Sequence, residues 1–586
     1  MSISVASAYD PDAIWAHNFD HPQAWLSTFP PMSMADMFGA SVEQHHAANL
    51  LDFLGRKYSF IQVNDAVRSA AAGFQALGIG KGDRVGLFLP NVPHYVAAYY
   101  GAMFAGATVV NFSPLYTVEE LRHQVEDSGT KLLVTLTAAA LLPTALKVLE
   151  NSSLERLVVG SIAGVLSPVK SLAYRLLKRG EIAAVPNDTR ISRFSQLISN
   201  DGAYAPVPID AENDVALIQY TGGTTGVPKG ARLTHQNLTA NARQVMGLDP
   251  WSGVGDDRIL GVLPFFHVFA NTCVLNRTVL NGGEIVMLPR FDAGQALAAV
   301  TRTRVTAMPG VPTMYQALLD HPKIGQTDWS SLRVCISGGA PLAAELKQRF
   351  ETATRSRVVE GYGLTESAGV VSANPYGHTG KAGTIGQPLP GTMVRIVDRD
   401  DPTKPAEPGV PGEIVVAGPQ IMRGYWNRPD ADADTYVVDG AGAWLRTGDV
   451  GVIDADGYIR IVDRLKDMIA VGGFKVYPST IETILYQHPQ VKEALVIGVA
   501  DAYRGEAPRA FVTLSGDADE WVDGKELASW LNPQLGKHER VDIVVVRSAL
   551  PKTLVGKLDR KALRAELASE SDEPSGEGMD EDEGNG

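Results

Sequence analysis

One uncharged stretch constrains the fold of this 586-residue chain more than any other feature. From Val85 to Val118 the sequence holds no Asp, Glu, Lys or Arg, and the stretch exceeds the roughly 20 apolar residues that a transmembrane helix needs. Pro90, Pro93 and Pro114 divide it, because proline is excluded from the interior of helices and central strands. We therefore interpret the stretch as a strand, a helix and a second strand in a buried β-α-β unit, and not as a membrane span.

The same alternation surrounds this unit. Short β-branched runs, such as KLLVTL and RLVVG, alternate with longer amphipathic runs over the first half of the chain, which predicts α/β layers with a largely parallel sheet. After Gly380 the pattern changes to short strands joined by Gly, Asp and Pro turns, with a hairpin at DADG, residues 454–457. After Asp467 it becomes α+β, as expected for a compact terminal domain.

The predicted fold class is α/β, in four parts. Residues 1–462 form a large multi-layered N-terminal domain that has two α/β subdomains and a small β-rich subdomain. Residues 463–467 form a hinge, and residues 468–568 form a small, mobile α+β C-terminal domain. Residues 569–586 hold eight acidic residues and no Lys or Arg, which predicts a disordered acidic tail.

Composition excludes several classes of protein. A content of 45% hydrophobic and 20% charged residues excludes a disordered chain. The formal charge of −14 argues against a nucleic-acid-binding protein. Two cysteines, Cys273 and Cys335, exclude a disulfide framework and suit a reducing compartment. The N-terminus has neither the basic start nor the apolar core of a signal peptide, so we expect a cytoplasmic protein.

The densest motif is the string YTGGTTGVPKG, from Tyr220 to Gly230, which follows an apolar run. Its glycines allow close approach of the backbone to a ligand, its threonines add hydroxyl donors and Lys229 adds a positive charge, a combination that suits a polyphosphate. It is not a Walker A loop, because Gly230 follows the lysine. Taken alone, the string could also be an ordinary glycine-rich turn.

At this string the chain resembles the adenylate-forming superfamily of acyl-CoA synthetases, luciferases and peptide-synthetase adenylation domains. Further motifs follow in that superfamily's order: LPFFHVFA, SGGAPL, EGYGLTES, WLRTGD, DRLKDMI, GGFKVYP and PKTLVGKLDR. The segments VVNFSPLYT, NPYG and KDMIAVGGFKVYP resemble bacterial long-chain fatty-acid–CoA ligases in particular. The resemblance implies a two-step reaction: ATP activates a fatty acid as acyl-adenylate, and the thiol of CoA then takes the acyl group.

The resemblance also implies site residues. The ATP-binding positions are Thr221, Gly222, Gly223, Thr224, Thr225, Gly226, Lys229, Gly339, Ala340, Pro341, Glu360, Gly361, Tyr362, Gly363, Thr365, Asp449 and Arg464. Among them Tyr362 is expected to stack on adenine and Asp449 to accept both ribose hydroxyls. Glu366 and Thr221 are the expected Mg²⁺ ligands, since Mg²⁺ prefers hard oxygen donors.

The resemblance assigns the catalytic positions to Lys557, His267 and Glu366. Lys557 is expected to bridge the acyl carboxylate and the α-phosphate, and His267 to lie at the carboxylate end of the acyl pocket. Without the resemblance, Lys557 would be interpreted as a solvated lysine and His267 as a core histidine.

The remaining positions concern the second half-reaction. Lys466 occupies the hinge position, and Gly472 with Gly473 would let the backbone approach the pantetheine arm of CoA. Two departures from the superfamily pattern are visible: Ala470 stands where some relatives carry a lysine, and GKHERVD, residues 536–542, replaces a Tyr-Lys-x-Pro segment.

A further segment, VLSPVKSLAYRLLKRG, combines apolar and basic residues at helical spacing. Val165, Val169, Leu172, Ala173, Leu176 and Leu177 are predicted on one face. Such a basic amphipathic helix is typical of peripheral membrane contact; the alternative is a helix packed on the protein core.

The sequence thus predicts a fatty-acid–CoA ligase of medium- to long-chain specificity that uses ATP, Mg²⁺ and CoA. An aryl or other acid–CoA ligase and a free-standing adenylation enzyme that loads a carrier protein are the alternatives. A non-catalytic lipid-binding protein on the same scaffold disagrees with the intact Lys557, Glu366 and Asp449. Homodimerisation stays open.

Overall fold

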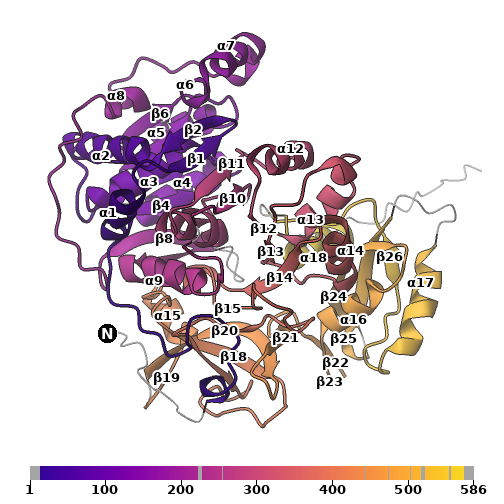
Figure 1. Cartoon of the computed structure of the whole chain (residues 1–586). Helices are drawn as coiled ribbons and strands as arrows, with labels where there is room; N and C mark the ends of the chain where they lie inside the picture. The colour runs from indigo at the N-terminus through magenta and orange to yellow at the C-terminus, as the bar shows by residue number, and fades with distance from the viewer. Residues whose placement is uncertain are drawn as a thin grey trace, which may run out of the picture. The chain divides into compact units, whose positions relative to one another are not determined.

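The computed structural model describes residues 13–221, 228–253, 255–440, 442–472, 474–501, 503–515, 522–553 and 556–572. The chain forms two units, one up to Ile461 and one from Val462 (Figure 1). This division falls one residue before the predicted boundary. Among the described residues, every helix is too short or too polar to cross a bilayer.

The first sheet of the first unit has the strand order β7-β6-β5-β3-β4-β8-β9. Neighbouring strands are parallel except for β9, which runs antiparallel to β8. The strands are β3 (Arg84–Phe88), β4 (Thr108–Phe112), β5 (Leu132–Leu136), β6 (Arg156–Gly160), β7 (Ile191–Arg193), β8 (Val215–Thr221) and β9 (Lys229–Thr234).

The uncharged stretch forms the predicted β-α-β unit at the centre of this sheet. Strands β3 and β4 pair in parallel, and α3 (Pro93–Phe104) connects them. Every residue of α3 is buried, and α2 (Phe60–Ala76) packs against it. Pro93 lies in the first turn of α3, where its missing N–H costs nothing.

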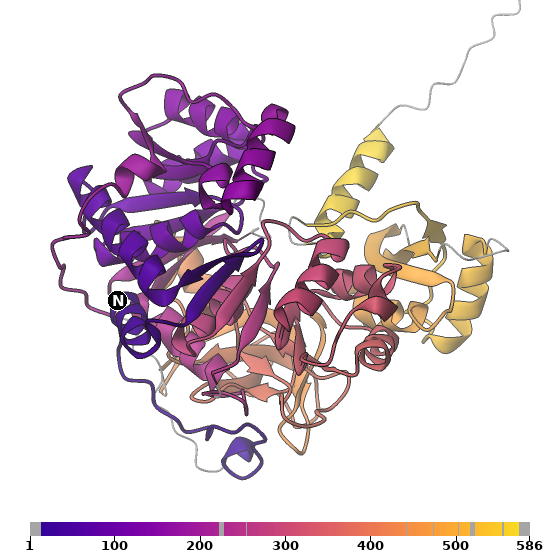
Figure 2. The ribbon, with the colours of Figure 1, turned by 45° about the horizontal axis from the view of Figure 1, so that its top comes forward.

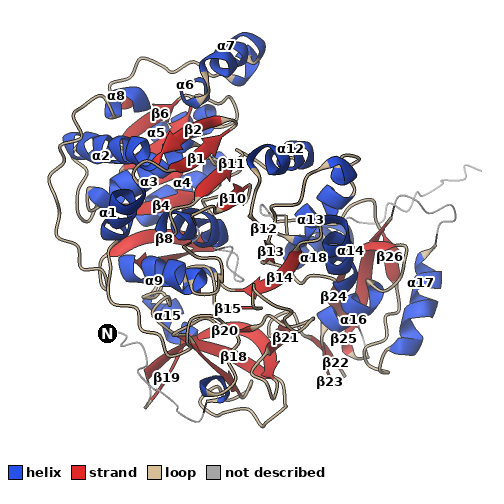
Figure 3. Ribbon diagram, viewed as in Figure 1, coloured by secondary structure: helices blue, strands red, loops and turns tan. Residues whose placement is uncertain are grey.

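The second sheet has the order β16-β15-β14-β13-β12-β10-β11-β1-β2, and it joins the N-terminal hairpin to strands that come more than two hundred residues later. Its strands are β1 (Asn49–Phe53), β2 (Arg56–Ser59), β10 (Arg258–Gly261), β11 (Glu284–Met287), β12 (Ala307–Gly310), β13 (Val334–Ser337), β14 (Arg357–Tyr362), β15 (Ser372–Ala373) and β16 (Gln387–Pro388). Figures 2 and 3 show helices packed around both sheets.

Further helices of the first unit are α1 (Met34–His45), α4 (Val118–Ser128), α5 (Leu142–Asn151), α6 (Ile162–Val165), α7 (Pro168–Leu177), α8 (Phe194–Leu197), α9 (His235–Met246), α12 (Ala293–Thr303), α13 (Pro312–Leu319), α14 (Ala344–Thr354) and α15 (Pro429–Thr435). Pro143 lies in the first turn of α5, where proline is tolerated.

The small β-rich part is also present as predicted. Its sheet runs β17-β18-β20-β19, with β17 (Met393–Val397), β18 (Gly412–Ala417), β19 (Tyr436–Asp439) and β20 (Gly442–Ile453). The DADG turn closes the hairpin between β20 and β21 (Ile459–Arg464): the Asp454 carboxylate accepts hydrogen bonds from the N–H groups of Asp456 and Tyr458, both at 3.0 Å.

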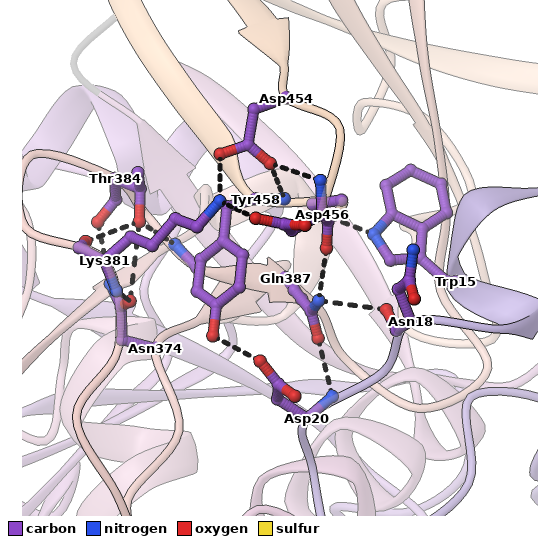
Figure 4. Close-up of polar contacts among 12 residues, drawn as sticks. Trp15, Asn18, Asp20, Asn374, Lys381, Thr384, Gln387, Asp454, Asp456 and Tyr458 are labelled. Atoms are coloured by element: carbon purple, nitrogen blue, oxygen red, sulfur yellow. Dashed lines mark hydrogen bonds and ion pairs between the residues drawn. The ribbon is translucent and has the colours of Figure 1, made fainter.

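The N-terminal segment is tied to this hairpin (Figure 4). The Gln387 amide donates to the Asn18 and Asp456 carbonyls at 3.0 and 2.9 Å, and its oxygen accepts from the Asp20 N–H at 2.8 Å. The Tyr458 hydroxyl donates to Asp20 at 2.5 Å. Lys381 forms ion pairs with Asp454, at 2.7 Å, and with Asp456. The network joins three segments that are remote in sequence.

The second unit has its own sheet and core. The strand order is β23-β22-β25-β24, with β26 beside β25. The elements are β22 (Ile469–Val471), β23 (Phe474–Val476), α16 (Pro478–Leu485), β24 (Val491–Asp501), β25 (Gly505–Leu514), α17 (Gly524–Leu531), β26 (Val544–Val546) and α18 (Arg560–Asp572). This α+β composition matches the expectation.

The predicted tail starts too early. Helix α18 continues to Asp572, so residues 569–572 are helical and not disordered. In the same helix, Leu563 is fully buried in a small core and Leu567 packs against it. Residues 573–586, the rest of the predicted tail, lie outside the described residues.

Candidate active site

The glycine- and threonine-rich string connects two antiparallel strands. Thr221 ends β8 and pairs with Lys229, which begins β9. The Thr221 hydroxyl lies 3.5 Å from the Lys229 carbonyl. Five of the predicted phosphate-binding residues, Gly222, Gly223, Thr224, Thr225 and Gly226, lie outside the described residues. The two strands nevertheless fix both ends of the loop.

Glu366 lies in the short helix η5 (Thr365–Ser367), which packs on β8 and β9, the two strands that the loop connects. Its carboxylate accepts a hydrogen bond from the Tyr425 hydroxyl at 2.7 Å, and its carbonyl accepts one from the Met422 N–H at 2.8 Å. The Lys229 ammonium lies 5.3 Å from the centre of the Tyr425 ring. Burial, reinforced by the Glu366 carboxylate, raises the pKa of Tyr425, so the hydroxyl stays a donor.

Tyr425 was not predicted from the sequence. It reaches the loop because the segment after Met422 runs antiparallel to β9, with Ala231 opposite Tyr425 and the Trp426 N–H donating to the Gly230 carbonyl at 2.7 Å. The only signal in the sequence would have been an aromatic pair, Tyr425 and Trp426, after a glycine.

Asp127 holds Tyr220, the residue before Thr221 at the end of β8. This carboxylate accepts a hydrogen bond from the Tyr220 hydroxyl at 2.6 Å and forms an ion pair with Arg428 at 2.8 Å. The Asp127 carbonyl accepts from the Trp426 indole at 3.1 Å. The start of the string, at Tyr220, is thus held by residues of α4 and of the segment before α15.

The expected adenine-binding residues follow two adjacent parallel strands, so their carboxyl ends meet at one edge of the second sheet. Gly339, Ala340 and Pro341 follow β13, and Glu360, Gly361 and Tyr362 end β14, with Ser337 paired to Glu360. Gly339 has a φ of +81°, a conformation that favours glycine. Burial raises the pKa of the Glu360 carboxyl to about 7.

Gly363 is required by packing. A Cβ atom there would lie 2.0 Å from the Gly369 carbonyl oxygen, which excludes any side chain. At Gly361 the nearest atom would be 3.7 Å away, so packing does not explain that glycine. Thr365 begins η5 directly after this turn.

Tyr362 and Asp449 are in contact, although 87 residues separate them. The Tyr362 hydroxyl donates to the Asp449 carboxylate at 2.5 Å, and Asp449 is only 3% exposed. The turn that carries Asp449 is held by the buried Glu413, which accepts hydrogen bonds from the Gly448 N–H at 3.1 Å and from Arg446 at 2.7 Å. The structure therefore brings the expected base-stacking and ribose-binding residues together, and it adds Glu413 as their support.

His267 precedes α10 (Val268–Ala270), and its Nδ1 accepts from the Phe269 N–H at 3.3 Å. The Phe269 ring lies against Gly338, where a Cβ atom would approach it to 3.1 Å. Asn91 holds the preceding segment: its amide bonds the Gly261 and Leu263 carbonyls, and its oxygen accepts from the Phe265 N–H at 2.8 Å. His267 thus lies beside the strand that leads to the expected adenine site.

The segment predicted as a hinge, residues 463–467, makes contacts within the second unit at both of its ends. Asp463 accepts hydrogen bonds from the Ser479 N–H and hydroxyl, both at 2.9 Å, and Asp467 pairs with Arg564 at 3.2 Å. Arg464 is the last residue of β21, and Lys466 lies in the turn that follows it.

Lys557 lies at the end of a tight turn in the second unit. The Lys557 N–H donates to the Thr553 hydroxyl at 3.2 Å, and the Lys557 carbonyl accepts from the Thr553 N–H at 2.7 Å. Gly472, between β22 and β23, has a φ of +57° and open space at its Cβ position. Gly473 lies outside the described residues. Beside them the exposed Phe474 ring stacks on His538 at 4.4 Å and 5°.

Comparison with known proteins agrees with this arrangement. Residues 38–426 match the AMP-binding enzyme family, and residues 480–557 match its C-terminal domain. The chain belongs to the AMP-binding enzyme family. Its fold also matches solved structures of that kind: ATP-bound MatB from Rhodopseudomonas palustris (TM-score 0.79, 28% identity, 92% of this chain and 99% of that one) and the anthranilate CoA ligase AuaEII with anthranoyl-AMP (TM-score 0.79, 26% identity, 93% and 99%).

Within the family, the chain is similar to enzymes that act on fatty acids. The long-chain-fatty-acid–CoA ligase of Bacillus subtilis (strain 168) is 39% identical, over 88% of this chain and 91% of the relative. The enzyme of the same name from Escherichia coli O6:H1 is 37% identical over 94% and 99%. A feruloyl-CoA synthase from Amycolatopsis is 36% identical over 87% and 94%, so aromatic-acid ligases are close as well.

Proposed function

We propose that this protein is an AMP-forming fatty-acid–CoA ligase of medium- to long-chain specificity. The observation that carries the proposal is the cluster at the phosphate-binding loop, where Glu366, Tyr425 and Lys229 meet, together with the Tyr362–Asp449 pair at the strand ends. All five residues belong to the first unit, and they include positions that the resemblance assigns to phosphate, metal, base and ribose. The similarity to ligases for long-chain fatty acids supports the choice of acid.

The reaction has two steps. In the first, a carboxylate oxygen of the fatty acid attacks the α-phosphorus of ATP; a P–O bond forms, pyrophosphate leaves and acyl-adenylate remains. In the second, the sulfur of CoA attacks the acyl carbon; a thioester forms, AMP leaves and the thiol proton passes to solvent or a base. Phosphoryl transfer of this kind depends on positioning and on positive charge around crowded anions.

Individual residues take specific tasks in this proposal. Lys229 faces the phosphates, Asp449 accepts the ribose hydroxyls and the Tyr362 ring covers adenine. His267 lies at the acyl carboxylate. Lys557, on the turn of the second unit, stabilises the charge that develops at the α-phosphate, and such a preorganised contact contributes on the order of 10²–10³ in rate. Gly472 and Gly473 leave room for the pantetheine arm.

We also propose Mg²⁺ as the metal, held by Glu366 and Thr221. The donor set fits this ion: the Tyr425 hydroxyl bonds only one Glu366 oxygen, and carboxylate and hydroxyl oxygens are hard ligands. The described residues include no cluster of three His, Cys, Asp or Glu side chains that could hold a metal, which suits an ion that relies on substrate phosphates and water. When bound, Mg²⁺ would neutralise phosphate charge.

Two further parts of the proposal concern the setting of the enzyme. We propose a cytoplasmic enzyme that contacts the inner face of the membrane peripherally, since its substrate partitions into lipid. Buried, reduced Cys273 and Cys335 support a reducing compartment.

The test of the function is CoA-dependent AMP release with saturated acids of graded chain length and with coumarate or benzoate for comparison. Activity that rises with chain length supports the proposal. Activity confined to aromatic acids would favour the aryl–CoA ligase, and AMP exchange without thioester formation would favour a carrier-loading enzyme.

A further inference from the structure

Helix α7 (Pro168–Leu177) is unusual in this fold because none of its residues is buried. Four of its apolar side chains are exposed: Val169 at 80%, Leu172 at 61%, Leu176 at 61% and Leu177 at 82%. Amphipathic helices in proteins normally owe their stability to the burial of the apolar face. Here that face is open to solvent, and Figure 1 shows α7 at the periphery of the first unit.

The orientation of α7 follows from helical geometry. At 3.6 residues per turn, the apolar side chains of positions 169, 172, 173, 176 and 177 cover an arc of about 140°. Tyr174 lies outside this arc and packs against the core of the first unit. The helix therefore rests on the protein through Tyr174 and presents its apolar side outwards. Val165, which the sequence suggested as part of this face, belongs to α6 and is half-buried.

The helix is held firmly at both ends. At its start, the Lys170 ammonium donates to the Leu54 carbonyl at 2.6 Å, and the Tyr58 hydroxyl donates to the Val165 carbonyl at 2.7 Å. After its end, the Ala139 N–H donates to the Glu181 carbonyl at 2.9 Å, and Ile182 bridges to Ala138. A helix fixed in this way cannot turn its apolar side inwards.

Basic residues dominate the charge around the apolar arc, and the one acid nearby, Glu181, follows the helix and forms an ion pair with Lys178 at 2.6 Å. Between Pro168 and Gly180 the sequence holds four bases, Lys170, Arg175, Lys178 and Arg179, and no acid; all four are exposed. On the helix, Lys170 and Arg175 flank the apolar arc on opposite sides. The surface thus offers an apolar strip bordered by cations, on a chain whose formal charge is −14.

We propose that α7 is a docking surface for an anionic lipid bilayer, with Val169, Leu172, Leu176 and Leu177 inserted among the acyl chains and the four bases at the headgroups. Apolar insertion and attraction to anionic headgroups act together in such helices. A second copy of the chain fits less well, because a symmetric contact of two α7 helices would place like charges together.

The test is co-sedimentation of the full chain with vesicles of phosphatidylcholine alone or mixed with phosphatidylglycerol, without ATP, CoA or fatty acid. This readout is independent of catalysis. We expect binding to the mixed vesicles, weaker binding to neutral ones and a loss of binding at high salt. The variant Leu172→Asp/Leu176→Asp should reduce partitioning at least about tenfold. Because neither side chain is buried, its thermal midpoint should match that of the unmodified protein.

A matched control carries the same charge change elsewhere. Val410→Asp/Val438→Asp alters two exposed apolar side chains of the β-rich part, 47% and 73% exposed, and should bind the vesicles as the unmodified protein does. Equal binding by the Leu172→Asp/Leu176→Asp variant would overturn the proposal. Failure of the unmodified protein to bind anionic vesicles would also overturn it. In that case, a change of oligomeric state in the Leu172→Asp/Leu176→Asp variant, measured by sedimentation velocity, would show that α7 forms a contact between two copies of the chain.

Discussion

The Tyr425 hydroxyl donates a hydrogen bond of 2.7 Å to Glu366, and the Tyr425 ring lies under the Lys229 ammonium. The tyrosine thus touches the expected metal ligand and the expected phosphate-binding lysine at once. Since a carboxylate that already accepts one hydrogen bond is restricted in orientation, we regard Tyr425 as a positioning residue for Glu366.

Removal of this hydroxyl should weaken the site without unfolding it. A hydrogen bond to a charged group contributes about 1.5–3 kcal/mol, so Tyr425→Phe should lower the rate of adenylate formation about tenfold or more and raise the Mg²⁺ concentration needed for half-maximal activity. Pyrophosphate exchange at graded Mg²⁺ concentrations measures both effects. Tyr436→Phe is the control, because that hydroxyl bonds the Met422 carbonyl at 3.0 Å and not a carboxylate. An unchanged Mg²⁺ dependence in Tyr425→Phe would contradict the positioning role.

Glu360 should make the stability of the protein depend on pH. Burial raises its pKa from 4.5 to about 7, so the folded state holds the proton more tightly than the unfolded state. Stability is therefore lost as pH rises from about 4.5 to about 7, by up to about 3 kcal/mol. Glu360→Gln, which is neutral throughout, should gain thermal stability relative to the unmodified protein as pH rises from about 5 to about 8. If the melting temperatures of the variant and of the unmodified protein changed with pH in the same way across that range, the buried-carboxyl explanation would be wrong.

The Gln387 network should stabilise the attachment of the N-terminal segment. The side chain is 1% exposed and bonds three backbone groups. Gln387→Ala leaves these groups without their partner at a cost of about 1–3 kcal/mol and should expose residues near Asn18 to proteolysis. Gln316→Ala, which removes one exposed contact to Asp320, serves as control. Limited proteolysis and thermal melts measure the cleavage near Asn18 and the stability of both variants. Equal cleavage rates and equal melting temperatures would show that the network contributes nothing.

Lys557 should act in only one half-reaction. Lys557→Ala should reduce adenylate formation on the order of 10²–10³ and keep most of the thioester-forming activity when acyl-adenylate is supplied. Rapid-quench assays of each half-reaction provide the measurement. Arg547→Ala, on an ion pair with Glu566 in the same unit, controls for general damage. If Lys557→Ala lost both half-reactions equally, the assigned role would be wrong.

Sequence patterns were sufficient for much of the fold. The uncharged stretch predicted β3, α3 and β4 because strand and helix periods differ and prolines mark the boundaries between them. The end of the second unit was predicted less well: α18 extends to Asp572, whereas the acidic residues from position 569 onwards predicted a disordered tail.

The candidate site divides in the same way. The roles of Tyr362, Glu366 and Asp449 were assigned from recognisable compact motifs, and these roles stay predictions. Tyr425, Asn91 and Glu413 could not be predicted, because each reaches the site through long-range strand pairing or through backbone hydrogen bonds far away in sequence.

The most direct test of the central claim is the product balance with a long-chain fatty acid. The purified protein, ATP, Mg²⁺, CoA and palmitate should yield acyl-CoA, AMP and pyrophosphate in equal amounts, measured together by mass spectrometry and a phosphate assay. Palmitate should also be preferred to coumarate in direct competition. Failure to form a thioester with fatty acids of any length, or formation of ADP in place of AMP, would contradict the account.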